Sequence, residues 1–366
     1  MGGTAGAMTE VITIEPFDPA ANEAVLLDLH AAHFAGRDAD SKRRTYVPWL
    51  LSNPLDGSIY LAARVDGAFA SFLGFMAREV VGFGQTFHAA LAFGAMTVEG
   101  FTGRALYSRL AHAGWTEAHR RGFHFAAGYT SRSYVLDMEL KMGWSNMGTA
   151  PVMVLPLDPP AIARAALPRL APLAKLAAPA GLLARSRARR RAARVLSAER
   201  AIERVPGFSP DLDALTDAWR NADRLTFAKD RRTLEWLYRS PHNPFHYDVV
   251  EARGGGKLLG FAVGRRMDLR GIDGYAILDL MALPGRDDVL APLAAMLVET
   301  ALAAYPEVIA ALVSRGDGAH AALRSLGFID SRNAFTLILR PTMERLPAGV
   351  TRPENWSNFW GNNDTV

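Results

Sequence analysis

The residues that could do chemistry are concentrated at positions 98–106, where a predicted strand passes into a predicted helix. Gly100 and Gly103 allow the backbone to turn sharply and to approach a ligand closely. The helix that follows presents unpaired N–H groups and the positive end of its dipole. Such a strand–loop–helix is typical of a pyrophosphate site, to which Arg104 would add charge. The residues expected at this site are Val98, Phe101, Thr102, Gly103, Arg104, Ala105 and Leu106.

This segment resembles the acetyl-CoA motif of the GNAT superfamily of N-acyltransferases. The family motif is Arg/Gln-x-x-Gly-x-Gly/Ala after the fourth strand, and this chain has Gly100-Phe-Thr-Gly103-Arg-Ala105 there. The second glycine and the final small residue match the motif, whereas Gly100 replaces the leading Arg or Gln. The resemblance implies acetyl-CoA as the co-substrate and no metal ion.

The resemblance extends over most of the chain. Residues 49–76 resemble the family's early helix end and strand hairpin, and residues 122–144 resemble its fifth strand, the next helix and the Leu-Gly-Phe ending. Residues 356–364 resemble the tail of tandem GNAT proteins found among bacterial polysaccharide-synthesis genes. The implied fold is α/β (α+β), with two tandem GNAT-like domains joined by a helical linker, each a mostly antiparallel central sheet flanked by helices.

The reaction implied by this resemblance is attack of an amine on a thioester carbonyl. The amine must be neutral, so a general base is useful, and His88 and Glu99 lie on or beside the strand that precedes the loop. The family's usual acid is a Tyr at the position of Glu139 in this chain, which leaves nearby Tyr134 as the candidate acid. The alternatives are a solvated carboxylate for Glu99, a hydrogen-bonded strand histidine for His88 and a packed side chain for Tyr134.

The second half of the chain repeats the first. Trp49-Leu-Leu-Ser-Asn-Pro matches Trp236-Leu-Tyr-Arg-Ser-Pro at an offset of 236 − 49 = 187 residues. Two further matches follow in the same order at nearly the same offset, which indicates duplication of one domain. The predicted division is an N-terminal domain at 1–157, a helical linker at 158–206, a C-terminal domain at 207–345 and a tail at 346–366.

The second copy lacks the glycine loop. Its corresponding segment contains Pro284, which has no N–H to donate. Asp287 and Asp288 would repel a pyrophosphate at short range. The sequence therefore predicts that only the first domain binds CoA, and that the second domain shapes the acceptor site or supports the first.

Regular elements are expected on both sides of the loop. Alternating and helical hydrophobic periodicity in the first 157 residues predicts strands and helices in the order of a mostly antiparallel sheet with late helices. The predicted strands are 11–14, 58–64, 69–80, 86–98, 123–129 and 150–157, and the predicted helices are 20–34, 103–121 and 132–142.

Composition excludes several classes of site. The 366 residues contain no cysteine, which excludes disulfides, thiolate zinc sites, iron–sulfur clusters and a cysteine nucleophile. The N-terminus has no basic run followed by an apolar run, and no stretch of about 18 apolar residues occurs. A cytoplasmic protein is expected.

The basic charge is concentrated at residues 161–198. The chain carries 41 − 37 = +4 charges, and this segment alone contains nine Arg or Lys and no acidic residue. It is either a solvated helical spacer, a surface that lies on the anionic inner membrane, or a contact for an acidic partner such as tRNA or acyl carrier protein. No DNA contact is expected.

Three functions remain open on the sequence. The first is an acetyl-CoA-dependent N-acetyltransferase that acts on an amine of a small metabolite or amino sugar. The second is an aminoacyl-tRNA-dependent peptidyltransferase, since those enzymes also resemble two GNAT domains in tandem. The third is a non-catalytic GNAT-like binding module.

Overall fold

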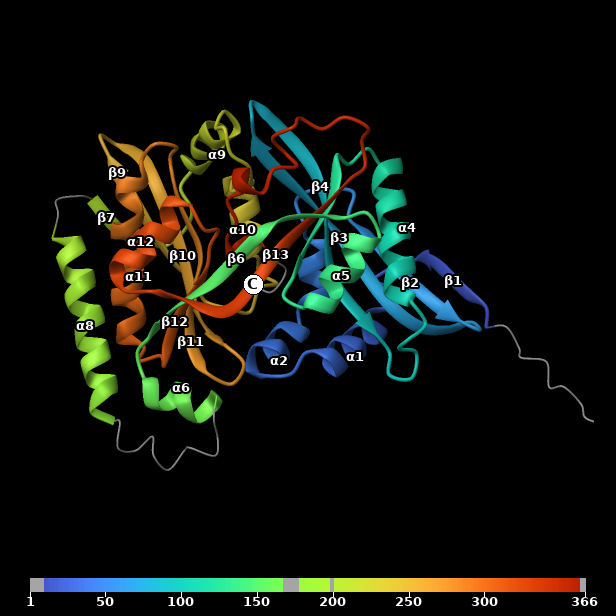
Figure 1. Ribbon diagram of the computed structural model, residues 1–366, viewed down its shortest axis with the longest axis horizontal. Helices are drawn as coiled ribbons and strands as arrows, with labels where there is room; N and C mark the ends of the chain where they lie inside the picture. The colour runs from blue at the N-terminus through green and yellow to red at the C-terminus, as the bar shows by residue number, and fades with distance from the viewer. Residues whose placement is uncertain (1–9, 167–177, 198–200, 363–366) are drawn as a thin grey trace, which may run out of the picture.

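The computed structural model describes residues 10–166, 178–197 and 201–362. The ends of the predicted first domain and tail, residues 1–9 and 363–366, lie outside this part. Across the described ranges the strands join in one 13-stranded sheet that runs through the molecule and is flanked by helices (Figure 1). The α/β fold with a large central sheet is therefore confirmed.

Each half of the chain contributes a similar series of strands. The first half provides β1 (Ile12–Pro16), β2 (Ile59–Val65), β3 (Ala68–Gly82), β4 (Gln85–Thr97), β5 (Phe125–Thr130) and β6 (Ser145–Pro156). The second half provides β7 (Ala201–Val205), β8 (Thr226–Phe227), β9 (Asp248–Gly254), β10 (Lys257–Asp268), β11 (Asp273–Ala282), β12 (Val308–Leu312) and β13 (Ile329–Pro341).

The helices lie between these strands in the chain. They are α1 (Glu23–His33), α2 (Arg37–Arg43), α3 (Tyr46–Leu51), α4 (Leu106–Arg120), α5 (Ser133–Lys141), α6 (Pro159–Ala166), α8 (Ala178–Leu196), α9 (Leu212–Arg220), α10 (Arg231–Arg239), α11 (Leu290–Ala303) and α12 (Gly318–Leu326). Short 3-10 turns follow at η3 (Asp287–Val289), η4 (Pro353–Asn355) and η5 (Trp360–Asn362).

The strand order of the sheet is symmetric about its centre. It runs β1-β2-β3-β4-β5-β13-β6-β12-β11-β10-β9-β7, so each strand of the first half has its counterpart at the mirrored place. The last strands of the two halves, β6 and β13, pair antiparallel in the centre with Thr149 opposite Thr336. Their offset of 336 − 149 = 187 residues equals that of Trp49 and Trp236.

The two halves exchange their last strands. β13 pairs with β5, and β6 pairs with β12, both antiparallel. The two sheets expected for two domains are therefore one, because the exchange pairs backbone groups that separate sheets would leave open at their central edges. A division of the chain near residue 157 stays a prediction, although β6 itself lies among strands of the second half.

The described part of the linker expected at 158–206 contains the helices α6 and α8 and the strand β7. Residues 167–177 and 198–200, with Arg169 and Lys175, lie outside the described residues. β7 then pairs with β9 at the edge of the sheet. The last residues of the expected linker thus belong to the sheet, where β7 mirrors β1.

One side of the basic helix α8 packs against α11, so this helix is not a fully solvated spacer. Ala188 and Ala192 are buried, and the Arg185 guanidinium donates to the carbonyl oxygen of Pro306 at 2.8 Å. Contact of this segment with a membrane, tRNA or acyl carrier protein stays a prediction. Among the helices that the structure describes, none is both long enough and apolar enough to cross a membrane.

The centre of the first half is a strand buried on both faces. Along β3, Leu73, Phe75 and Ala77 face a core that α4 covers, while Phe72 and Met76 face the larger core shared with the second half. A strand covered on both faces is apolar along its whole length, which is why alternation is weak here. This burial fixes β3 and the neighbouring β4, whose end carries the glycine loop.

Candidate functional site

The glycine loop connects β4 to α4 and has the open geometry expected of a phosphate site. Gly100, Gly103 and Ala105 have φ of +88°, +81° and +53°, and Ala105 is the residue that precedes the helix. No atom lies within 4 Å of where a Cβ would stand at either glycine. The backbone therefore turns in the left-handed region and leaves open space in front of the loop.

Arg104 holds the loop in shape. Its Nη1 donates to the carbonyl oxygen of Gly100 at 2.8 Å, and its Nε lies 2.9 Å from the carboxylate of Glu10. The guanidinium also lies 5.0 Å from the centre of the Phe101 ring. The Arg104 charge is thus beside the loop, where it can attract a phosphate, but it already shares its donors with Glu10.

The other predicted loop residues lie around this turn. The N–H of Val98 bonds to the carbonyl of Ala70 and ends the pairing of β4 with β3, at 2.8 Å. Thr102 is exposed, and Leu106 is buried beneath the helix start. All seven predicted residues therefore belong to one strand end, one turn and one helix N-terminus.

A β-bulge and a strand divergence lie next to this loop. Phe72 pairs with Met96 but Gly74 pairs with Phe93, so Gly94 and Ala95 together oppose a single residue of β3. A bulge leaves backbone groups outside the ladder. β4 and β5 pair in parallel only from Ala89 to Leu91, whereas β5 pairs with β13 on its other side along its whole length. A gap therefore separates the C-terminal ends of β4 and β5. It is bordered on one side by β4 backbone groups that do not pair with β5.

Two of the three predicted catalytic side chains lie at the end of the sheet where β4 and β5 finish. Glu99 is exposed two residues after β4 ends, and Tyr134 is exposed in the first turn of α5, four residues after β5 ends. The hydroxyl oxygen of Tyr134 accepts a hydrogen bond from Arg132 at 2.9 Å. Because β4 and β5 are parallel, both side chains belong to the same end of the sheet.

His88 lies at the other end of β4. Nine residues separate it from Thr97, which is about 30 Å along a strand. Its backbone N–H donates to Nδ1 of His124 at 3.0 Å, and it lines a separate hollow of about 400 Å³. The structure does not bring His88 together with Glu99, and a catalytic role for His88 stays a prediction.

Glu139 is buried at the position where the family carries its tyrosine. It lies on α5 and accepts a hydrogen bond from the hydroxyl of Tyr107 on α4. Burial raises the pKa of Glu139 to about 7, although the bond from Tyr107 and the charge of Arg340 act in the opposite direction. Burial and the neighbouring carboxyl also raise the pKa of Tyr107. The pair links the helix after the glycine loop to the helix after β5.

The second half has a different segment at the mirrored place. After β11 the chain passes through Pro284 into the 3-10 turn η3, where Asp287 and Asp288 precede α11. Arg286 donates from Nε to the Asp288 carboxylate at 3.0 Å. Two carboxylates at the helix start repel an anion, so this helix end does not fit a pyrophosphate.

The gap between β11 and β12 contains a buried charged cluster that the sequence did not predict. Lys229 and Asp279 are fully buried with Nζ 2.8 Å from Oδ1, and the hydroxyl of Tyr238 also donates to Asp279. Arg78 from β3 is buried nearby, 5.3 Å from the ring centre of Phe227. Burial lowers the pKa of Lys229 to about 8, while the Asp279 carboxylate acts in the opposite direction.

The C-terminal segment seals the same gap. η5 packs against β11, and a Cβ at Gly361 would collide with the side chains of Asp279 and Tyr238. The second gap is therefore filled by the chain's own residues, whereas the first opens beside a glycine loop. In the part of the chain that the structure describes, no group of three or more potential metal-ligand side chains occurs.

No family model and no curated protein matches the sequence. Solved structures match over nearly the whole chain. A GCN5-related N-acetyltransferase (GNAT) from Anabaena variabilis has a TM-score of 0.62 at 12% identity, covering 91% of this chain and 73% of that one. A GNAT protein from Kribbella flavida has a TM-score of 0.57 at 16% identity, covering 92% and 72%.

Saccharomyces cerevisiae N-myristoyltransferase with bound myristoyl-CoA also matches. Its TM-score is 0.58 at 11% identity, and the match covers 92% of this chain and 84% of that one. At such low identities these likenesses show the fold. The chain has the fold of the GCN5-related N-acetyltransferases.

Proposed function

We propose that the protein is an acyltransferase that takes an acyl group from acyl-CoA and transfers it to an amine. The observation that carries this proposal is the open glycine loop at the start of α4, next to the bulge and the divergence of β4 from β5. The fold likeness supports it, because one of the matching structures contains myristoyl-CoA. Acetyl is the proposed acyl group, and a small metabolite or amino sugar is the proposed acceptor.

Each part of the site has a separate task. The loop from Val98 to Leu106 would hold the pyrophosphate with backbone N–H groups and the helix dipole. The CoA thioester supplies the activated acyl carbonyl. Backbone N–H groups at the β4 bulge would stabilise the developing oxyanion. Glu99, directly or through water, would take the proton from the amine, and Tyr134 would return a proton to the leaving thiolate.

We propose that the second half binds no CoA. Asp287 and Asp288 stand where the first half has its glycine loop, and the buried Lys229–Asp279 cluster with η5 fills the strand gap. Its task would be to complete the acceptor site and to hold β13 against β5.

Titration calorimetry with acetyl-CoA tests the donor site, using Gly103→Asp and Gly103→Asn as a matched pair. Asp and Asn are similar in size and both tolerate positive φ better than other residues do. A carboxylate in the open space before the loop should repel the pyrophosphate, so Gly103→Asp is expected to weaken binding at least tenfold relative to Gly103→Asn.

Wild-type protein should bind one acetyl-CoA per chain. Equal affinity of the Asp and Asn variants would remove the glycine loop from the proposed site. Folded wild-type protein that binds no acetyl-CoA would contradict the donor assignment, and binding of aminoacyl-tRNA would then become the next measurement.

A further inference from the structure

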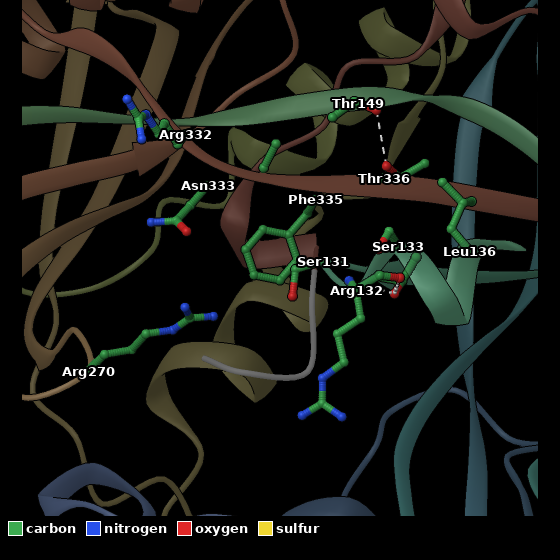
Figure 2. A pocket seen from close by; sticks show the side chains of 12 residues that line it. Ser131, Arg132, Ser133, Leu136, Thr149, Arg270, Arg332, Asn333, Phe335 and Thr336 are labelled. Carbon is green, nitrogen blue, oxygen red and sulfur yellow. Dashed lines mark hydrogen bonds between the residues drawn. The ribbon is translucent and has the colours of Figure 1, made fainter.

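A hollow of about 330 Å³ lies at the end of β5, where the two halves of the sheet meet (Figure 2). Its walls come from the turn between β5 and α5, from the first residues of β13, from β6 and from the hairpin between β10 and β11. Part of the wall is formed by Thr149 of β6 and Thr336 of β13, where these two central strands pair. Their hydroxyl oxygens lie 3.0 Å apart. The hollow is thus built from both halves of the chain.

Three arginines from three separate segments surround this hollow. They are Arg132 before α5, Arg270 in the β10–β11 hairpin and Arg332 on β13, and the lining contains no Asp or Glu. Figure 2 shows the Arg270 side chain extended towards the hollow from one side, with Arg132 on the other. Among the described residues, none of the three forms an ion pair, which leaves their positive charge uncompensated at one place.

Arg270 occupies a strained backbone position. It has φ of +58° and Gly271 has φ of +83°, and Leu269 and Ile272 hydrogen-bond to each other across them, at 2.9 Å from N to O in one direction. These are the central residues of a type I′ hairpin turn, a place that favours Asn or Gly. An arginine there costs stability, and such strain is common where a side chain serves a ligand.

The remaining lining suits a polar, anionic ligand. Thr130, Ser131 and Ser133 contribute hydroxyl groups, and Phe335 supplies an apolar surface. α5 begins at Ser133 without a side-chain cap, so its first N–H groups and dipole add to the positive potential. Arginine forks bind phosphate and carboxylate oxygens in pairs, which lysine does not do.

From these observations we infer that the hollow binds an anionic group, phosphate or carboxylate, of the acceptor molecule. This inference rests on the proposed function, because it places the acceptor relative to the donor loop. The hollow lies at the C-terminal end of β5 and the glycine loop at the C-terminal end of the parallel strand β4. An acceptor anchored by Arg270 and Arg332 can therefore extend its amine towards the gap between the two strands.

The test compares D-glucosamine 6-phosphate, D-glucosaminate and D-glucosamine by titration calorimetry without CoA. The three probes share an amine and differ in their anionic group. Wild-type protein should bind at least one of the anionic probes at least tenfold more tightly than glucosamine, and the two anionic probes distinguish phosphate from carboxylate. Arg270→Asn and Arg332→Gln should each weaken the preferred anionic probe about tenfold and leave glucosamine unchanged.

Arg270→Asn keeps the test free of folding effects, since asparagine suits the turn better than arginine does. Arg232→Gln, which removes an exposed arginine of α10 that does not line the hollow, is the matched control and should change nothing. Equal binding of all three probes, or an anion preference that survives the double variant Arg270→Asn/Arg332→Gln, overturns the inference.

The Gly103→Asp variant separates this inference from the donor assignment. It should lose acetyl-CoA and retain the anionic probe. If it loses both, the probe binds at the glycine loop and the hollow is not its site. Wild-type protein that binds the anionic probe but no acetyl-CoA would leave the hollow in place and contradict only the proposed donor.

Discussion

Glu139 and Arg270 show how much a single side chain depends on its surroundings. Both are ordinary polar residues in the printed sequence. In the structure Glu139 is a buried carboxyl between two helices, and Arg270 stands at a left-handed turn beside a hollow. Neither property follows from residue type, because burial and backbone angle are set by segments that are distant in the chain.

The burial of Glu139 predicts a pH-dependent stability. Its pKa is about 7 in the folded protein and near its ordinary value when unfolded, so the folded state holds a proton between those values that the unfolded state has released. The Glu139 contribution to stability should therefore fall as pH rises from about 5 to 7, by at most about 1.4 kcal/mol per pH unit. Buried His30, whose pKa is lowered to about 4, contributes in the opposite direction below about pH 6.5. Glu139→Gln should therefore make the slope of stability against pH more positive than in the wild-type protein, measured by urea unfolding at pH 5, 6 and 7.

The matched control is Glu203→Gln, which changes an exposed glutamate of β7. It should leave the slope of the wild-type protein intact. A Glu139→Gln protein with the wild-type slope would show that Glu139 does not carry this proton.

At the scale of elements, each half of the sheet has one pair of parallel strands whose C-terminal ends separate, and the two gaps differ in what fills them. The gap beyond β4 and β5 opens beside a glycine loop, whereas the gap beyond β11 and β12 holds Asp279, Lys229 and η5. The same local architecture therefore gives one candidate donor site and one filled core. The second gap depends on a buried charge pair, which is stable only while both partners remain.

Removing one partner of that pair should be costly. Asp279→Asn leaves Lys229 and Arg78 buried without a countercharge, and should lower the free energy of unfolding by about 3–5 kcal/mol. Lys229→Met in the same background should restore part of that loss, because it removes one of the two excess charges. Urea unfolding of the two single variants and the double variant measures the coupling.

A loss below about 1 kcal/mol for Asp279→Asn would contradict this account, since that is the range of an exposed ion pair.

At the scale of the whole molecule, the two halves meet through matching residues. The rings of Trp49 and Trp236 stack at 4.9 Å and 7°. Each indole N–H donates to the other residue's backbone carbonyl, at 3.3 and 3.1 Å. The hydroxyls of Thr149 and Thr336 also meet, in one hydrogen bond of 3.0 Å. Residues 187 positions apart thus contact each other, as expected when two copies of one unit pack around a twofold axis.

This contact predicts coupled effects of unequal size. Trp49→Phe should lower the free energy of unfolding by about 1–3 kcal/mol, because the buried carbonyl of Trp236 loses its indole donor. Trp236→Phe should cost less, because the carbonyl of Trp49 keeps the N–H and hydroxyl donors of Ser52. The double variant should lose a different amount from the sum of the two. Trp219→Phe, whose N–H donates to Ala282 alone, is the control and should combine additively with Trp49→Phe.

Full additivity of Trp49→Phe with Trp236→Phe would show that the two rings do not act as one contact.

Local sequence patterns predicted most of the regular elements and the glycine loop. Hydrophobic periodicity gave strands close to β2, β3, β4 and β5 and the helices α4 and α5, because these elements follow local patterns. The loop at 98–106 could be identified because a backbone with positive φ favours glycine, and two glycines stand there in the sequence. Hydrophobic periodicity did not predict α2 or the start of α3, since short helices between residues 37 and 51 carry little periodicity; only the end of α3 was implied, by the resemblance of residues 49–76.

Tertiary structure alone decided the exchange of β6 and β13, the distance of His88 from the loop, the Lys229–Asp279 cluster and the arginine-lined hollow. Strand pairing partners and buried ion pairs join residues that are far apart in the chain, and a single sequence records neither. The periodic pattern shows which side of a strand is apolar, but only the packed sheet shows which strand lies next to it.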